Sequence, residues 1–247
     1  MYFIANWKMF GDLRTLNSLK RVINFSKTNK KKKFKLIYCP PNTLIYPLSK
    51  KFKKTTIEVG AQNCHESDIY GAYTGHVNSK MIKDAGANYV ILGHSENRAN
   101  GEKDYLINKK IKTALKNELK VIFCIGETLK QRKNKQTHLT LITQIKEGLK
   151  GIKNYNNIII AYEPVWAIGT GIVPKTELLK KIMKFVKSYF EKKTKLNMST
   201  LKFLYGGSVK SNNIKTLSEI NEIDGFLIGG ASQESKKFID IIKKTFN

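Results

Sequence analysis

Several polar side chains of the kinds used in proton transfer directly follow short apolar runs in this sequence. Asn6 and Lys8 follow the first of these runs. His94 and Glu96 follow the fourth run, and Glu163 follows the sixth. A carboxylate and an imidazole can move protons, and a lysine ammonium placed directly after a buried strand needs an anionic partner. These residue types therefore indicate general acid and base chemistry on an anionic substrate.

Two glycine pairs follow the last two apolar runs. The first is Gly206-Gly207, followed by Ser208, and the second is Gly229-Gly230. Each pair alone is typical of a turn, but together their backbone N–H groups can hold a phosphate. The sequence contains neither a G-x-x-x-x-G-K-[ST] motif nor a G-x-G-x-x-G motif after a strand. Nucleotide or dinucleotide binding therefore has no motif to support it.

Each of these residues has a simpler interpretation when it is taken alone. Lys8 is one of many lysines, and a single histidine such as His94 is more often structural than catalytic. The functional interpretation becomes the better one for the whole set, because all its members follow strands that one fold would bring together.

Eight short runs are apolar along nearly their whole length, as are strands buried on both faces of a parallel sheet. These runs are 3–5, 36–38, 57–59, 90–92, 121–123, 158–160, 203–205 and 226–228. Between them, apolar residues recur at helical spacing. The clearest stripes are Leu16-Leu19-Ile23, Ile107-Ile111-Leu115, Ile142-Ile145-Leu149, Leu178-Ile182-Phe185-Tyr189 and Phe238-Ile241-Ile242.

Strands that alternate with helices predict an α/β fold with a parallel sheet. About eight such units in 247 residues match a single (β/α)8 TIM barrel better than an open sheet. No linker or shift in composition divides the chain, so residues 1–247 are expected to form one catalytic domain. In such a barrel the active site lies at the C-terminal ends of the strands, where the polar residues described above are found.

The chain is strongly basic, because 45 Lys and Arg against 19 Asp and Glu give a net charge of +26. This charge favours an acidic partner such as a polyanion, an anionic membrane or a phosphorylated substrate. The lysines are scattered, and Asn and Ile are also abundant, as in a drift of composition. The tightest cluster, residues 30–33, is expected in a solvated loop at the other end of the barrel. Without alternating aromatic and basic residues, no specific nucleic acid partner is expected.

Other features argue against secretion, membrane insertion and a metal centre. The chain has an odd number of cysteines, and these lack metal-ligand spacing. We therefore expect Cys39, Cys64 and Cys124 to be reduced, buried thiols. No apolar run approaches the roughly 18 residues of a membrane span, and the N-terminus does not resemble a signal peptide. The four histidines have no clustered partners at metal spacing. The sequence therefore predicts a cytoplasmic protein with no membrane or metal partner.

Six segments carry a resemblance to a known family. They are Asn6-Trp7-Lys8-Met9, Gly93-His94-Ser95-Glu96, Cys124-Ile125-Gly126-Glu127-Thr128, residues 161–171, Tyr205-Gly206-Gly207-Ser208-Val209 and Gly229-Gly230-Ala231-Ser232. In sequence and in order they resemble the triosephosphate isomerase family. The resemblance covers essentially the whole chain, and the segment from Ala161 to Gly171 is close to diagnostic alone.

The resemblance implies interconversion of dihydroxyacetone phosphate and D-glyceraldehyde 3-phosphate through an enediolate, in glycolysis and gluconeogenesis. Glu163 matches the base of that family, and His94 matches the neutral imidazole that polarises the carbonyl. Lys8 and Asn6 match groups that hold the substrate and stabilise charge on its oxygens, and Glu96 matches a carboxylate near Lys8. The residues that match the phosphate-binding set are Gly169, Ser208, Gly229 and Gly230. The family also implies a lid over residues 164–174 and no metal or organic cofactor.

The resemblance implies a homodimer as well. In the family, the loop that holds Thr74, Gly75 and His76 here reaches into the neighbouring subunit. The position of His76 is usually acidic and faces an arginine at the position of Asn97. Because both residues differ here, we expect a neutral hydrogen bond between His76 and Asn97 of the two subunits.

Three rival functions can be set against this interpretation. Another phosphosugar isomerase or synthase on the same barrel would need a different acid and base pair, and the chain offers none besides His94 and Glu163. A nucleic-acid-binding or polyanion-binding protein is motivated only by the net charge, and its binding would have to survive physiological salt. An inactive structural relative would not explain why every motif residue is present.

Overall fold

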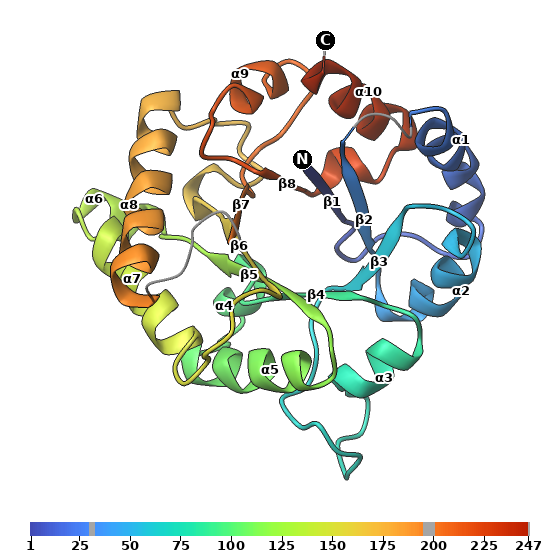
Figure 1. The fold of residues 1–247 in the computed structure, drawn as a ribbon, viewed down its shortest axis with the longest axis horizontal. Coiled ribbons are helices and arrows are strands. Elements are labelled where there is room, and N and C mark those ends of the chain that lie inside the picture. The colour runs from blue at the N-terminus through green and yellow to red at the C-terminus, as the bar shows by residue number, and fades with distance from the viewer. Residues whose placement is uncertain (30–32, 195–200, 247) are drawn as a thin grey trace.

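The computed structural model describes residues 1–29, 33–194 and 201–246. Within these ranges eight parallel strands close into a barrel in chain order, with the helices in a ring outside it (Figure 1). The strands are β1 Tyr2–Asn6, β2 Lys35–Cys39, β3 Glu58–Ala61, β4 Tyr89–Leu92, β5 Lys120–Ile125, β6 Ile158–Tyr162, β7 Lys202–Tyr205 and β8 Gly225–Ile228. In β1, Ile4 aligns with Ile37 of β2 and with Leu227 of β8, which closes the ring. The predicted (β/α)8 barrel is confirmed.

The barrel strands are buried on both faces, which explains their continuous apolar sequence. Each contains the run that predicted it, except that β3 begins at Glu58 and leaves Ile57 just outside. One set of side chains fills the barrel interior, and the alternate set packs beneath the helices. The interior set is Ile4, Ile37, Cys39, Tyr89, Ile91, Ile122, Cys124, Ile159, Ala161, Leu204 and Leu227. Cys39, Cys64 and Cys124 are buried and unbridged, as expected.

Helices and short 3₁₀ turns connect the strands. The helices are α1 Lys20–Thr28, α2 Asn42–Phe52, α3 Ser79–Asp84, α4 Ser95–Ala99, α5 Asp104–Lys116, α6 Leu129–Lys133, α7 Thr137–Gly148, α8 Thr176–Thr194, α9 Ile214–Ser218 and α10 Ser235–Thr245. The 3₁₀ turns are η1 Thr15–Leu19, η2 Val165–Ala167 and η3 Gly230–Ser232. The first predicted stripe is therefore divided between η1 and α1. None of the described helices is both long and apolar enough to cross a membrane.

In α8 the buried stripe differs from the predicted one. Of the predicted residues only Ile182 is buried, while Leu178, Phe185 and Tyr189 are half-buried. The buried residues are Leu179, Ile182, Met183, Val186 and Phe190. Two adjacent rows of apolar residues both have helical spacing in this helix, so spacing alone could not decide which row faces the barrel. Packing decides it, with the ring of Phe190 placed 6.2 Å from that of Phe203 in β7.

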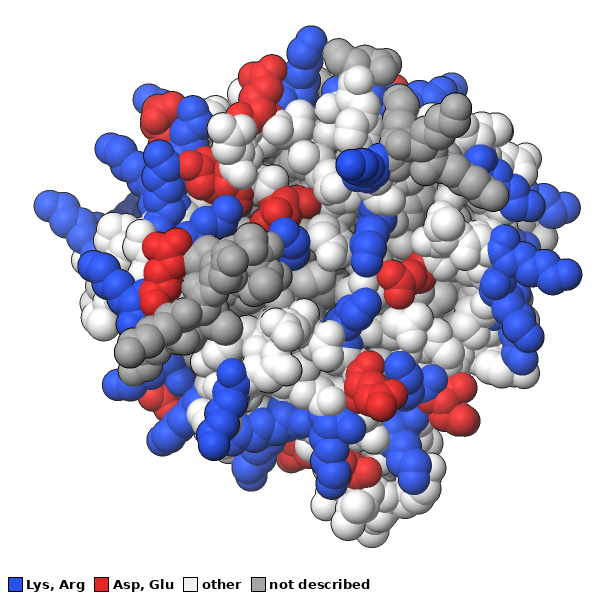
Figure 2. Space-filling model, viewed as in Figure 1, with Lys and Arg blue, Asp and Glu red and all other residues white. Residues whose placement is uncertain are grey.

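Basic side chains gather around the end of the barrel where the strands begin, which is the face seen in Figure 2. Lys35, Lys120 and Lys202 stand at the starts of β2, β5 and β7, and Lys202 Nζ lies 3.6 Å from an Asp224 carboxylate oxygen. Of the predicted lysine cluster, residues 30–32 lie outside the described residues. The Lys33 carbonyl accepts a hydrogen bond from the N-terminal amine of Met1, which places it at this same end.

Candidate active site

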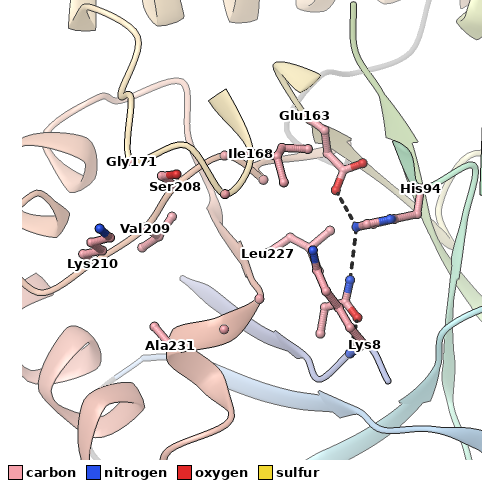
Figure 3. Close-up of a pocket in the computed structure, with 16 residues that line it drawn as sticks. Lys8, His94, Glu163, Ile168, Gly171, Ser208, Val209, Lys210, Leu227 and Ala231 are labelled. Atoms are coloured by element: carbon pink, nitrogen blue, oxygen red, sulfur yellow. Dashed lines mark hydrogen bonds and ion pairs between the residues drawn. The ribbon is translucent and has the colours of Figure 1, made fainter. Parts of the chain in front are cut away.

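The first strand carries Asn6 and Lys8 to the opposite end of the barrel, where they face a cavity (Figure 3). Lys8 has a φ of 56°, a left-handed conformation that few residues other than glycine adopt. Two hydrogen bonds hold it there. The Lys8 N–H donates to Asn6 Oδ1 at 3.1 Å, and Gln62 Nε2 donates to the Lys8 carbonyl at 2.9 Å. The long Lys8 side chain thus begins from a fixed point.

A carboxylate lies beside Lys8 at the rim of the cavity. Lys8 Nζ is 2.5 Å from Glu96 Oε1. Glu96 itself is exposed and does not line the cavity, so it acts on the site through Lys8 and through His94, whose Nδ1 lies 3.7 Å from Glu96 Oε2. The pair fixes the ammonium position and offsets part of its charge.

The imidazole of His94 follows β4 and is buried at the start of α4. Its Nδ1 accepts a hydrogen bond from the Glu96 backbone N–H at 3.2 Å, which leaves Nε2 as the nitrogen that carries the proton in the neutral ring. Nε2 faces the cavity, 3.1 Å from Glu163 Oε1 and 3.2 Å from Asn6 Nδ2. His94 is therefore placed to donate a proton to an oxygen bound in the cavity.

The carboxylate of Glu163 follows β6 and is almost fully buried. Its Oε2 accepts the Ser95 backbone N–H at 3.0 Å, which fixes one oxygen and leaves Oε1 toward His94. The neighbouring backbone has two glycines without which Glu163 could not lie here. A Cβ on Gly126 would lie 1.7 Å from the Glu163 carbonyl oxygen, and one on Gly206 would lie 2.8 Å from Glu163 Cγ. Sequence reasoning had not assigned these two glycines to the base.

The whole cavity has a volume of about 230 Å³. Glycine backbone lines the end away from His94 and Glu163. Gly169, Ser208, Gly229 and Gly230, which the sequence suggested as phosphate-binding residues, all border it. Added Cβ atoms would find open space at Gly169 and Gly230, and a Cβ at Gly229 would lie 3.3 Å from Lys8 Cε. The Ser208 hydroxyl donates to the Ala167 carbonyl at 2.8 Å rather than into the cavity. The cavity thus joins an acid and base pair at one end to bare backbone at the other, with the Lys8 side chain between them.

Comparison with known proteins identifies the family. A model of the triosephosphate isomerase family matches residues 1–245. This chain belongs to the triosephosphate isomerase family. The triosephosphate isomerases of Thermodesulfovibrio yellowstonii and Dictyoglomus thermophilum are each 41% identical to it over 244 residues, and these alignments cover 98% and 97% of both chains respectively. The crystal structure of triosephosphate isomerase from Bartonella henselae has a TM-score of 0.90 and 32% identity, covering 100% of this chain and 99% of that one.

Membership of the triosephosphate isomerase family gives the reaction. The chain is an isomerase that interconverts dihydroxyacetone phosphate and D-glyceraldehyde 3-phosphate, a step of glycolysis, and its substrate is a phosphorylated triose. Among the described residues no group of three or more His, Cys, Asp or Glu side chains is placed to hold a metal ion.

The lid expected from the triosephosphate isomerase family is tied down at its N-terminal end. Trp166 Nε1 donates to Glu127 Oε1 at 2.9 Å, and the fully buried Glu127 also accepts from the Tyr162 hydroxyl. The Arg132 guanidinium lies 4.3 Å over the Trp166 ring. Beyond η2, Gly169 and Gly171 have φ values of 71° and 77° and are exposed. The sequence had indicated the lid but not this anchor.

The single arginine after the family's His-Ser-Glu segment braces the loop that carries His94. Arg98 Nε donates to the Gly93 carbonyl at 2.7 Å, and its two terminal nitrogens contact Asp104 at 2.6 Å and the Cys124 carbonyl at 3.2 Å. These contacts use all three guanidinium nitrogens of Arg98, so one side chain ties the loop that carries His94 to α5 and β5.

Opposing effects act on the pKa of His94. Burial is the largest single effect and lowers it. The charge and hydrogen bond of Glu163, together with the charge of Glu96, raise the pKa by more, so that it lies above the ordinary 6.5. The Glu96 N–H bond to Nδ1 opposes protonation, as burial does. Once Glu163 has taken a proton and lost its charge, the main raising influence is gone and the neutral imidazole is favoured.

We expect the substitution Glu163→Gln to lower the pKa of His94, because it removes the carboxylate that raises that pKa. An NMR titration of the imidazole in both proteins measures this. The raised pKa also stabilises the wild-type fold fully below about pH 6.5, and this contribution is lost as the pH rises through the folded-state pKa. Chemical denaturation should therefore show a larger deficit for the variant at low pH than at high pH. An unchanged pKa would contradict the electrostatic explanation.

Proposed function

We propose that Glu163 is the general base and His94 the electrophile of the isomerase reaction. Glu163 takes a proton from the carbon next to the carbonyl and returns it to the neighbouring carbon. The negative charge that develops on the carbonyl oxygen is met by the Nε2–H of His94. The observation that carries this proposal is the placement of Glu163 Oε1 and His94 Nε2, 3.1 Å apart, on one cavity wall.

Asn6 and Lys8 complete the charge stabilisation in this proposal. Both line the cavity beside His94, with the Lys8 ammonium toward the glycine-lined end. A cation between the two ends of the substrate can favour both the enediolate oxygens and the phosphate, because charge at each end is negative. Glu96 acts as a positioning residue, since it contacts Lys8 and does not line the cavity.

The phosphate of the substrate is proposed to bind the backbone at Gly169, Ser208, Gly229 and Gly230. Backbone N–H groups hold a phosphate well where no side chain blocks its approach. Closure of residues 164–174 would bring the Gly169 amide onto the phosphate and exclude water. Exclusion matters here because an enediolate exposed to water can lose phosphate by elimination.

A coupled assay with D-glyceraldehyde 3-phosphate, run in D2O, tests the proposed roles. The wild-type enzyme should form dihydroxyacetone phosphate and incorporate deuterium from the solvent at the carbon to which Glu163 returns the proton. His94→Gln should lower kcat far more than it raises KM, because the interaction it removes is strongest in the transition state. A variant with wild-type kcat would exclude His94 as the electrophile.

We propose that the enzyme is a homodimer formed through the loop that holds Thr74, Gly75 and His76. In Figure 1 this connection between β3 and α3 extends away from the barrel. It carries large exposed apolar side chains at Ile69 and Tyr70, and such groups mark protein interfaces when they cluster.

The salt dependence of dimer dissociation tests the proposed contact between His76 and Asn97 of two subunits. A neutral hydrogen bond contributes roughly 1 kcal/mol and responds weakly to salt, whereas an ion pair is screened. At pH 8 we therefore expect little change in the dissociation constant with added salt. The double variant His76→Glu/Asn97→Arg restores opposite charges and should make dissociation salt-dependent. A monomeric active enzyme, or equal salt dependence in both proteins, would contradict the proposed contact.

The remaining expectations from the sequence stay proposals. Residues 1–247 act as one catalytic domain in the cytoplasm, serve gluconeogenesis as well as glycolysis, and require no metal or organic cofactor. The three buried, unbridged thiols are compatible with a reducing compartment. No specific nucleic acid partner is proposed, because no observation besides the net charge favours one.

A further inference from the structure

Lys210 borders the substrate cavity, yet the proposed mechanism gives it no role. It lies two residues beyond Ser208, in the connection that follows β7. Figure 3 places it on the same side of the cavity as Ser208 and Val209, away from His94 and Glu163. Its position is therefore at the end proposed for the phosphate rather than at the end where the proton moves.

The backbone at Lys210 is held in place. The Lys210 N–H donates to Asn213 Oδ1 at 2.9 Å, and Asn213 Nδ2 donates to the Ser208 carbonyl at 3.0 Å. Val209, between them, is buried. Asn213 thus links the backbone of Lys210 to that of Ser208, a residue of the proposed phosphate site.

The Lys210 ammonium reaches across to the lid. A Cβ placed on Gly171 would lie 3.8 Å from Lys210 Nζ, which is ordinary contact distance. Lys210 is exposed, and in the described part of the chain no carboxylate lies within ion-pair distance of it. Lys8 differs, because Glu96 offsets part of its charge. The cavity mouth thus carries a cation whose charge is free to meet an anion.

We propose that Lys210 is a second cation that anchors the phosphate group of the substrate, at the side covered by the lid. The proposal rests on the proposed function, because it takes the glycine-lined end as the phosphate site. A phosphate dianion carries more charge than the partly offset Lys8 can balance. The Lys210 ammonium, close to Gly171 and on the side of the phosphate site, supplies further positive charge and so favours substrate binding. It leaves the proton transfer unaffected.

The substitution Lys210→Met tests this proposal. We expect KM for D-glyceraldehyde 3-phosphate to rise about three- to tenfold, the effect of one partly screened charge near a dianion, with kcat changed less than about twofold. The dissociation constant of inorganic phosphate, measured by titration calorimetry, should rise by a similar factor. Turnover of D-glyceraldehyde, which lacks the phosphate, should be unchanged. This last readout separates anchoring from a structural role.

Two further variants control the experiment. Lys210→Arg keeps the charge and should restore most of the affinity for phosphate. Lys237→Met removes a lysine from the groove next to Lys210, but Lys237 Nζ is paired with Glu234 at 2.5 Å, so affinity should be unchanged. Wild-type phosphate affinity in Lys210→Met, or an equal loss with D-glyceraldehyde, would overturn the proposal. An inactive wild-type enzyme would instead contradict the proposed function, and calorimetry with phosphate would still test Lys210.

Discussion

Replacement of Glu163 by glutamine is expected to lower kcat at least about 100-fold, the usual contribution of a general base. The glutamine side chain has nearly the same volume, and its amide oxygen can still accept the Ser95 N–H that Glu163 Oε2 accepts at 3.0 Å. It cannot take a proton from carbon. Binding should therefore change little while chemistry is lost, and steady-state kinetics with D-glyceraldehyde 3-phosphate separates KM from kcat. Deuterium exchange at the substrate carbon should fall in parallel with kcat.

The aspartate variant provides a matched control for this result. Glu163→Asp keeps the base but withdraws it by one methylene, so it should retain more activity than the glutamine variant while still losing rate through misplacement. Circular dichroism would establish that both variants keep the fold. More than about a hundredth of wild-type kcat in a folded Glu163→Gln enzyme would remove Glu163 from the role of base.

The second large expected effect is a loss of stability when the buried ion pair between Lys110 of α5 and Glu102 is broken. Lys110 Nζ pairs with a Glu102 oxygen and lies 3.2 Å from Asn63 Oδ1, and both charged side chains are at most 10% exposed. The other Glu102 oxygen has no hydrogen-bond partner among the described residues. Lys110→Met therefore leaves a buried carboxylate without its counter-charge. We expect the free energy of unfolding to fall by about 3–5 kcal/mol, measured by chemical denaturation at fixed protomer concentration.

A second pair on the same helix gives the control. Lys116 pairs with Asp68, but its side chain is 72% exposed. Lys116→Met should cost much less, because water replaces the lost partner. The double variant Lys110→Met/Glu102→Gln should recover part of the stability lost in the single variant, since no net charge is then buried. Equal losses at Lys110 and Lys116 would show that burial does not set the cost.

The strands were predictable from sequence because burial leaves a local pattern. Every residue of β6, Ile158–Tyr162, is buried, so its sequence is continuously apolar. Helix faces were less predictable where apolar residues form two adjacent rows. In α8 the choice between Leu178 and Leu179 depends on packing against the barrel, which helical spacing does not contain.

The chemical groups of the site were also predictable, because each follows a strand and carries a distinctive side chain. The contacts that orient them were not. Glu163 accepts the N–H of Ser95, 68 positions away, and Gln62 holds the carbonyl of Lys8, 54 positions away. Such contacts depend on strand register around the barrel. Glu127 shows the same limit, since its hydrogen bond to Trp166 spans 39 positions.

Gly126 and Gly206, the two glycines beside Glu163, limit which substitutions this enzyme can accept during evolution. Gly126 faces the Glu163 carbonyl oxygen and Gly206 faces its Cγ, so neither position has room even for a methyl group. At these two positions any residue other than glycine would displace Glu163. A saturation library should therefore tolerate nothing at these positions, while it accepts wide variation among the surface lysines. Substitutions can therefore accumulate over most of the surface while the enzyme stays active, provided that Gly126 and Gly206 are kept.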